Sequence, residues 1–254
     1  MEHSEILSFI RELAALSGEA IKPYFARSDL QVEKKRDESP VTEADRRAEL
    51  VMRDLIRDRY PSHGIIGEEF GAENPESPFV WVLDPIDGTR PFTCGCPLFG
   101  TLICLLANGH PVMGAIHNPI LSQLLVGDNE KTTLNDKPVH VGNTSELEDA
   151  VLLLSNLKLP EEYQDKDRWR ELRSRVADIY TWGDCFGYLL VASGGADIML
   201  DPIMNPWDLM ALVPVIRGAG GIITDWQGGD PVTGNSIIAS NPALHPQILT
   251  ILNG

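Results

Sequence analysis

The stretch Asp84-Pro85-Ile86-Asp87-Gly88-Thr89 directly follows a strongly apolar run, Phe79-Val80-Trp81-Val82-Leu83. The apolar run predicts a buried strand. Pro85 has no N–H for a sheet and Gly88 permits a sharp turn, so we expect the strand to break there and to turn its acids outward. Carboxylates, a carbonyl and a hydroxyl at one strand end suit a hard cation such as Mg²⁺. The alternative is a polar turn in which Asp84 caps the next segment.

Length and charge narrow the class of protein. A chain of 254 residues can bury a large core, as one big domain or two tightly joined halves. The formal net charge of −16 argues against nucleic acid and anionic membranes as partners, because both would be repelled, and favours cations as ligands. No stretch approaches the roughly 20 apolar residues of a membrane span, and the polar, acidic N-terminus lacks the pattern of a secretory signal. We therefore expect a cytoplasmic protein.

The cysteines and histidines give no sign of a zinc site. Cys94-Gly95-Cys96 has neither zinc-knuckle spacing nor a matching second pair, and the six histidines are scattered without an HExxH-like pair. In a large acidic chain without an export signal, we expect the four cysteines to stay reduced.

Helical spacing of apolar residues predicts an amphipathic helix over residues 5–26. The charged stretch 33–40 reads as a loop or hairpin. A second helix follows, because Thr42 and Asp45 stand at the spacing of a capping box, and residues 60–64 end it.

Strand signals follow. A short strand is expected near residues 65–66, and consecutive apolar runs over 98–127, divided by Asn108-Gly109, predict an antiparallel meander. A further hairpin near 131–137 and a strand at 151–154 complete the first half.

The second half alternates between helical and strand patterns. We expect helices at 186–193, at 207–217 and after residue 242, with strands at 197–200, 222–223 and 237–238. This alternation is typical of an α/β layout. No linker or repeat separates the halves, so we predict two closely packed α/β subdomains, 1–150 and 151–254, with a cleft between them. The first would carry most of the metal ligands, and the second the substrate-selecting residues and one ligand.

Acidic residues recur at turns and element ends rather than on solvated helix faces; these are Asp45, Glu68, Asp84, Asp87 and Asp208. With their neighbours they form three motifs in order: Gly67-Glu68-Glu69, Asp84 to Thr89, and Trp207-Asp208 with Gly218-Ala219-Gly220-Gly221. In these motifs the whole chain resembles the inositol monophosphatase-like family of metal-dependent phosphatases. The resemblance implies an α/β fold of α+β type, built as a layered αβαβα sandwich of two tightly packed subdomains, and a homodimer.

The resemblance also implies ligands for two or three Mg²⁺ ions, with Mn²⁺ as an alternative. One ion would bind Glu68, Asp84 and the Ile86 carbonyl. A second would bind Asp84, Asp87 and Asp208, so that Asp84 bridges the two. Two cations a few ångströms apart can flank a phosphate, one activating the attacking water and the other neutralising the leaving oxygen.

Catalytic and phosphate-binding roles follow from the same resemblance. Thr89 and Asp45 would orient and deprotonate the water with help from Glu68, and the N–H groups of Gly88 and Thr89 would bind phosphate oxygens. Simpler alternatives remain for single residues. Asp45 also fits as the helix-capping partner of Thr42, a role compatible with catalysis, and Asp208 fits as a helix cap. We expect Glu69 to lie behind the metal ligands or at the surface rather than to bind a metal ion itself.

Substrate choice is expected to depend on the second half. Inositol monophosphatases carry small residues where Asp184 stands and usually a Glu in place of Asp201. A second carboxylate suits a cationic leaving group better than a neutral polyol, because the cation offsets the cost of the buried charge. With the segments 87–90, 97–103 and 211–215, this departure resembles the histidinol-phosphate phosphatase branch.

Asp184 and Asp201, with Asn205 nearby, are therefore the predicted partners of the amine and imidazole of the substrate. Asp184 as a helix N-cap is the alternative. We expect Trp182 to lie in the core rather than to act as a platform on which a ring stacks. Arg90 lies near the phosphate or pairs with a surface acid.

The sequence thus predicts a Mg²⁺-dependent phosphomonoesterase that hydrolyses a small phosphorylated substrate, L-histidinol phosphate, without a covalent intermediate. Inositol monophosphatase activity is the second hypothesis. Sugar bisphosphates fit less well, since no cluster of Lys and Arg marks a second phosphate site. A regulatory protein-binding module on the same fold is the alternative of another class. It would require lost metal ligands or a basic docking surface, and the sequence has neither.

Overall fold

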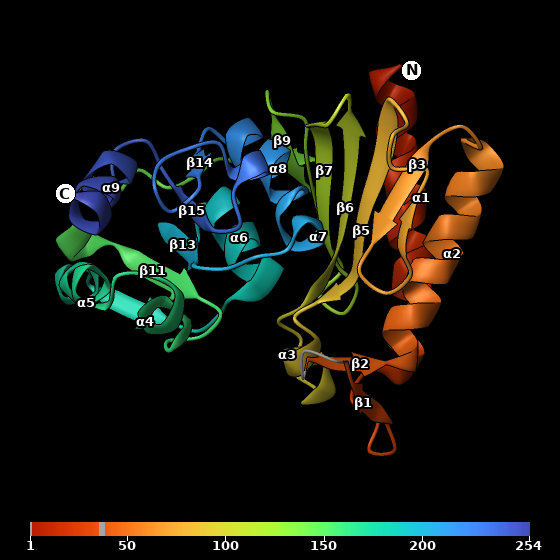
Figure 1. The fold of residues 1–254 in the computed structure, drawn as a ribbon, viewed down its shortest axis with the longest axis horizontal. Coiled ribbons are helices and arrows are strands. Elements are labelled where there is room, and N and C mark those ends of the chain that lie inside the picture. Colours follow the sequence, from red (N-terminus) through yellow and green to blue (C-terminus); the bar gives the residue numbers. More distant parts are fainter. Residues whose placement is uncertain (1, 36–38) are drawn as a thin grey trace.

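The computed structural model describes residues 2–35 and 39–254, and within them helices and sheets alternate in five layers (Figure 1). Helices α1 (His3–Ile21) and α2 (Glu43–Arg59) cover the outer face of the first sheet. A middle layer of helices separates this sheet from a second one, which is covered in turn by α5 (Lys166–Arg175) and α9 (His245–Asn253). The predicted αβαβα sandwich is confirmed. None of the described helices is long and apolar enough to cross a membrane.

The outer helices differ slightly from the prediction. Helix α1 ends at Ile21 rather than residue 26, and the chain continues as the 3₁₀ turn η1 (Lys22–Tyr24), because Pro23 has no N–H for an α-helical bond. Helix α2 begins at the predicted capping box: the Thr42 hydroxyl accepts the N–H of Ala44, and the Asp45 carboxylate accepts the N–H of Thr42.

A short hairpin precedes α2. Strand β1 (Val32–Lys34) pairs antiparallel with β2 (Pro40–Thr42), as predicted, and the part of that prediction on residues 36–38 lies outside the described residues.

The first sheet has the strand order β10-β9-β8-β7-β6-β5-β3-β4. The predicted meander forms from three neighbouring antiparallel strands, and the predicted hairpin near residues 131–137 extends it. Strand β3 runs parallel to β5, and the other neighbours are antiparallel. The strands are β3 (Gly64–Gly67), β4 (Gly71–Glu73), β5 (Phe79–Asp87), β6 (Gly100–Ala107), β7 (His110–Asn118), β8 (Gln123–Gly127), β9 (Thr132–Leu134) and β10 (Lys137–Pro138).

The expectation that β5 breaks after Leu83 is wrong. The strand runs on to Asp87 through a bulge: Asp84 pairs with Leu102 and Asp87 with Gly100, so β5 has one residue more than β6 between these pairs. A bulge accommodates Pro85, which cannot donate to the ladder, and re-aims the side chains around it. The turn comes later, at Gly88 with φ of 89°, and leads into the short helix α3 (Thr89–Thr93).

The middle layer contains α6 (Asp184–Ala192), α7 (Pro206–Leu209) and α8 (Leu212–Gly218). The prediction of one helix over 207–217 is therefore wrong. Pro214 has no N–H for the Met210 carbonyl four residues earlier and its ring would clash with that carbonyl, so the helix is interrupted. The Met210 carbonyl instead accepts the Cys104 thiol of β6, with sulfur and oxygen 3.3 Å apart.

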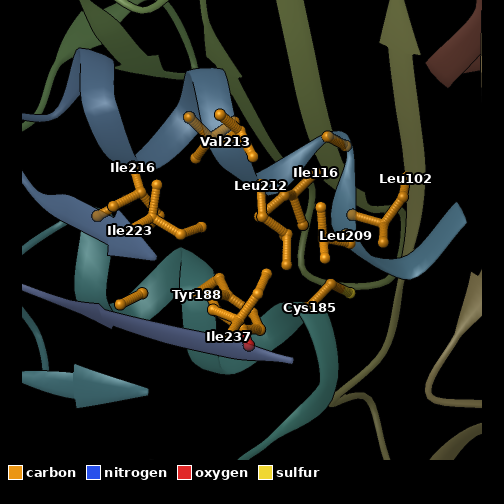
Figure 2. Packing of buried hydrophobic residues seen from close by; sticks show 14 of the residues in the cluster. Leu102, Ile116, Cys185, Tyr188, Leu209, Leu212, Val213, Ile216, Ile223 and Ile237 are labelled. Carbon is orange, nitrogen blue, oxygen red and sulfur yellow. The ribbon is translucent and has the colours of Figure 1, made fainter. Parts of the chain in front are cut away.

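Apolar packing joins this layer to both sheets. Figure 2 shows side chains of α8 between Ile116 of the first sheet and Ile223 of the second. Gly114 lets β7 approach closely, because a Cβ there would lie 2.1 Å from the Ala211 carbonyl oxygen. The cluster spans residues of both predicted subdomains, and the division at residue 150 stays a prediction.

The second sheet has the order β12-β11-β13-β15-β14 and mixes parallel with antiparallel pairs. Its outer face packs on Trp169 of α5 and Ile248 of α9. Helices α4 and α5 and strand β12 were not predicted. The strands are β11 (Val151–Leu154), β12 (Asp178–Tyr180), β13 (Ile198–Asp201), β14 (Ile222–Thr224) and β15 (Ile237–Ser240); the short helices are η2 (Leu147–Asp149), α4 (Leu159–Tyr163) and η3 (Pro231–Thr233).

Candidate active site

A cleft of about 430 Å³ lies where the end of β5 faces α7. Many of the predicted site residues line it, among them Glu68, Asp84, Asp87, Gly88, Thr89 and Asp208. Ile86 and Asn205 line it as well. The bulge in β5 and the helix start of α7 therefore bring together acids that are more than 100 positions apart in the sequence.

Three carboxylates form the centre of this cleft. Oxygen atoms of Asp84, Asp87 and Asp208 lie within 4.8 Å of one another. Asp84 Oδ1 accepts the N–H of Ile86 at 2.9 Å, and the N–H of Cys185 at the start of α6 donates to Asp87 Oδ2. These backbone bonds fix the directions of the two β5 carboxylates.

Asp208 also caps its helix. Its Oδ2 accepts the backbone N–H of Asn205 at 3.0 Å and the side-chain amide of Asn205 at 3.2 Å. The capping role weighed from the sequence is thus present, and it uses one carboxylate oxygen. A ligand role for the other oxygen is compatible with it. Asn205 is held by this contact at the rim of the cleft.

Like charges and burial make the cluster chemically suited to hold a cation. Burial raises the pKa of Asp84 well above its usual range, and the charges of Glu68 and Asp87 raise it further. Burial likewise raises the pKa of Asp87, with Asp184 and Asp208 adding to the effect. Ionised, these acids repel one another at close range, and a divalent cation relieves that repulsion. Oxygen donors in this number and spacing fit Mg²⁺.

Glu68 carries an ion pair that the sequence had not revealed. Lys35 Nζ lies 2.6 Å from Glu68 Oε1 and 2.6 Å from Glu69 Oε1. Burial raises the pKa of Glu68 and of Glu69, and the Lys35 ammonium opposes that rise. Glu68 also lines the cleft, whereas the side chain of Glu69 is only 5% exposed. The one sequence signal for Lys35 was a basic run ahead of an acidic motif.

Asp45 reaches the site from the N-terminus of α2. Its Oδ2 accepts the N–H of Thr42 at 2.8 Å and the Thr42 hydroxyl at 2.6 Å, while Oδ1 lies 3.4 Å from Thr89 Oγ1. Burial raises the pKa of Asp45 to about 6, and the hydrogen bonds from Thr42 oppose the rise. A group that titrates near neutral pH beside a hydroxyl in the cleft is suited to accept a proton.

A second cleft of about 290 Å³ adjoins the first, sharing Glu68, Gly88 and Thr89 with it. Asp184 lines it, and a Cβ built on Gly88 would lie 3.2 Å from Asp184 Oδ2. Asp184 has a φ of 49°, and its N–H donates to Ser155 Oγ at 2.9 Å. The alternative of Asp184 as N-cap is wrong, because Gly183 holds that position.

Asp201 lies behind Ser155 at the end of β13. Its Oδ1 accepts the Ser155 hydroxyl and its Oδ2 accepts the Tyr188 hydroxyl, both at 2.8 Å. Burial and the charge of Asp184 raise the pKa of Asp201 to about 7, and burial raises that of Asp184 to about 6. Both oxygens of Asp201 already have donors, so direct contact with a substrate stays a prediction. Ser155 and Tyr188 were missed because only the folded chain brings them to Asp201.

The structure places Trp182 and Arg90, whose roles the sequence had left open. Trp182 is 44% exposed and stacks on Tyr180 with ring centroids 4.3 Å apart, so the expected core position is wrong. Arg90 lines the second cleft with Asp184, and its charge opposes the rise in the pKa of that carboxyl.

Comparisons with known proteins agree with these features. The sequence profile of the inositol monophosphatase family matches residues 2–254. The histidinol-phosphatase of Chlorobaculum parvum is 35% identical over 248 residues, covering 97% of this chain and 96% of that protein. The chloroplastic bifunctional phosphatase IMPL2 of Arabidopsis thaliana is 43% identical over 219 residues; that match covers 85% of this chain and only 63% of the plant protein. The structure of an inositol monophosphatase from Zymomonas mobilis superimposes with a TM-score of 0.88 at 34% identity, covering 100% of both chains.

Proposed function

Since the chain belongs to the inositol monophosphatase family, we propose that it is a Mg²⁺-dependent phosphomonoesterase whose substrate is L-histidinol phosphate. The coarser part of this function follows from membership: the family consists of metal-dependent phosphatases, and the chain is a phosphoric monoester hydrolase. The substrate, the number of metal ions and the roles of individual residues are the proposal.

The proposed metal ligands are the oxygens that face the first cleft. Glu68, Asp84 and the Ile86 carbonyl would hold one Mg²⁺. Asp84, Asp87 and Asp208 would hold a second. A third ion, or Mn²⁺ in place of Mg²⁺, is the alternative. Support comes from the three carboxylates within 4.8 Å of one another. When bound, the cations would neutralise the phosphate and lower the pKa of the attacking water.

Thr89 and Asp45 are the proposed water-activating pair. Thr89 Oγ1 lies 3.0 Å from the Ile86 carbonyl and 3.4 Å from Asp45 Oδ1, and its single proton can go to either acceptor. Donation to Asp45 leaves the Ile86 carbonyl free and lets the hydroxyl oxygen accept a proton from water. Asp45 then takes the excess proton, and the N–H groups of Gly88 and Thr89 would bind the phosphate oxygens.

The carboxylate of Asp184 in the second cleft is the observation that carries the choice of substrate. Asp184 stands next to the proposed phosphate-binding turn at Gly88, and Asp201 adds a second negative charge behind it. Two nearby carboxylates in a buried setting favour a leaving group with positive charge. The amine and imidazole of histidinol phosphate provide such charge, and the histidinol-phosphatase relative supports the assignment.

Inositol monophosphatase activity is the second candidate, and the likeness to the Zymomonas mobilis structure favours it. A neutral polyol can accept and donate hydrogen bonds at Asp184 but gains nothing from its charge. The two candidates therefore differ in how much each depends on that carboxylate.

A substrate panel tests the proposal. We expect a higher kcat/KM for histidinol phosphate than for inositol 1-phosphate, and Asp184→Ala is expected to lower the value for histidinol phosphate by about tenfold or more while changing the other less. Equal losses on both substrates would refute the assignment of Asp184. Asp84→Asn is expected to abolish both activities, and full activity of that variant would overturn the metal site.

We further propose that the enzyme acts as a homodimer in the cytoplasm, without nucleic acid or membrane partners. The net charge of −16 supports the last point, since it repels polyanions. Light scattering coupled to size exclusion measures the assembly, and a monomer at working concentration would contradict the dimer.

A further inference from the structure

The turn that presents Glu68 rests on a fully buried carboxylate, Glu49 of α2. Glu49 Oε2 accepts the N–H of Glu69 at 2.7 Å, and Oε1 accepts the N–H of Phe70 at 3.2 Å. Glu49 is 0% exposed, so its carboxylate is shielded from bulk solvent. A buried carboxylate has to be solvated by protein donors, and here two of them are consecutive N–H groups of the turn.

Arg53 completes the arrangement one helical turn further on. Its Nε donates to Glu49 Oε1 at 2.7 Å, and its Nη2 donates to the carbonyl of Gly71, the first residue of β4. Both members of this pair are buried, at 2% and 0% exposure of their side chains. A buried ion pair often contributes no more stability than an apolar pair of equal size. The Glu49–Arg53 pair is therefore better explained by the position that it gives to the neighbouring turn than by overall stability.

Close approach of Glu49 depends on Gly67. A Cβ at that position would lie 2.0 Å from Glu49 Oε1, so a side chain there would displace the carboxylate. On its other side the turn is tied to β5, because the N–H of Glu68 donates to the Leu83 carbonyl at 3.2 Å. The turn is therefore fixed between Glu49 and the residue just before Asp84.

Apolar packing does little to hold this segment. Phe70 is 44% exposed, and all three residues of β4 are exposed. Polar contacts therefore hold the turn: Glu49 accepts the N–H groups of Glu69 and Phe70, and the N–H of Glu68 itself donates to Leu83.

We propose that Glu49, braced by Arg53, is a positioning residue that sets the distance between Glu68 and Asp84 and thereby the affinity for the divalent cation. This inference rests on the proposed role of Glu68 as a ligand. Residues behind metal ligands commonly change metal affinity by about 10- to 100-fold when they are altered.

Calorimetric titration of the protein with Mg²⁺ alone tests the inference without reference to activity. Glu49→Gln keeps the size of the side chain but removes its charge and presents an amide N–H₂ to groups that donate. We expect the Kd for Mg²⁺ to rise by about tenfold or more. Leu172→Ala in α5, in a different layer, is the matched control: it should lower Tm and leave the Kd unchanged. An unchanged Kd in a folded Glu49→Gln protein overturns the inference.

Two more variants separate this inference from the proposed function. Gly67→Ala displaces the Glu49 carboxylate without altering its charge and should weaken Mg²⁺ binding in the same direction, so the test survives if Glu49→Gln does not fold. In a Glu68→Gln background, Glu49→Gln should add little, because its effect passes through Glu68. If Glu68→Gln alone leaves the Kd unchanged, the proposed metal site fails. If Glu68→Gln weakens binding and Glu49→Gln adds its full effect to it, Glu49 acts by another route and only the positioning role fails.

Discussion

Thr89 Oγ1 lies 3.4 Å from Asp45 Oδ1, although the two residues are 44 positions apart in the sequence. The second oxygen of the same carboxylate accepts the N–H and the hydroxyl of Thr42 at the start of α2. The Asp45 side chain thus caps the start of α2 with one oxygen and lies near the Thr89 hydroxyl with the other. The capping role and the catalytic role, both open from the sequence, are compatible in one geometry.

Removal of the Thr89 hydroxyl should cost turnover rather than substrate binding. We expect Thr89→Ala to lower kcat by about 10²- to 10⁴-fold, the usual range for a lost acid–base step, with little change in KM. Thr89→Ser keeps the hydroxyl and should retain most of the activity. Steady-state kinetics at saturating Mg²⁺ measures both variants. A Thr89→Ala enzyme with the kcat of the wild type would remove Thr89 from the mechanism.

Stabilisation by Mg²⁺ should grow with pH. The pKa of Asp45 is raised to about 6 by burial, and those of Asp84 and Asp87 are raised as well. Acids with raised folded-state pKa values stabilise the protein fully below their unfolded pKa, and this contribution is lost as the pH rises through the folded pKa. The cation binds the deprotonated form and offsets that loss.

The increase in Tm on adding Mg²⁺ to chelator-treated protein should therefore be larger at about pH 8 than at about pH 5.5, because ligands with raised pKa values are more fully ionised at the higher pH. Scanning fluorimetry of wild type and Asp84→Asn measures it. We expect the variant to show a small shift at both pH values, and a wild-type shift independent of pH would contradict the explanation.

Ser155 should affect substrate binding through Asp184 and Asp201. Its hydroxyl donates to Asp201 Oδ1 at 2.8 Å and accepts the N–H of Asp184 at 2.9 Å. Ser155→Ala leaves both partners short of a hydrogen bond, so we expect KM for histidinol phosphate to rise by about five- to 30-fold, equivalent to roughly 1 to 2 kcal/mol, with the Kd for Mg²⁺ unchanged. Ser174→Ala, at an exposed position of α5, is the control. A lower kcat at constant KM would assign Ser155 to chemistry instead.

Buried histidines should make the protein less stable in acid. Burial lowers the pKa of His245 to about 4, and its ring nitrogens lie 3.0 Å from the hydroxyls of Thr224 and Ser240. Because the unfolded state binds the proton more readily, stability is lost as the pH falls from about 6.5 towards 4. His117, with its pKa also lowered to about 4 by burial, acts in the same direction.

Urea unfolding with a chelator present, at several pH values, measures this effect. His245→Gln should reduce the acid loss by about 1 to 3 kcal/mol, even if the variant is less stable at neutral pH. The exposed His110→Gln should leave the pH dependence as it is in the wild type. Parallel profiles for wild type and His245→Gln would contradict the assignment.

Local signals account for what the sequence predicted well. The capping box of Thr42 and Asp45 lies within four residues, and its predicted contacts are present. The acids of the β5 end gather as expected because they share one strand end. The prediction of a single helix over 207–217 was wrong, although Pro214 is a local signal that could have indicated the interruption between α7 and α8.

Long-range contacts account for the rest. Lys35 meets Glu68 from 33 positions away, and Tyr188 meets Asp201 across the step from α6 to β13. No spacing rule in the sequence encodes such pairs. The left-handed backbone of Asp184 had no spacing signal either, although Asp is among the non-glycine residues enriched in that region. The core position predicted for Trp182 was wrong for another reason: tryptophan is usually buried, but this one lies on the surface.

The acids of the proposed metal site come from two layers of the sandwich: Asp84 and Asp87 belong to the first sheet, and Asp208 belongs to the helices of the middle layer. A cation bound at the proposed site would connect the first sheet to the middle layer of helices. Its loss would loosen the stack where strand meets helix, while each layer kept its own secondary structure. On heating or in mild denaturant, enzyme activity should therefore be lost before circular dichroism detects any loss of secondary structure. Activity would then be the earliest measure of how well the layers pack together.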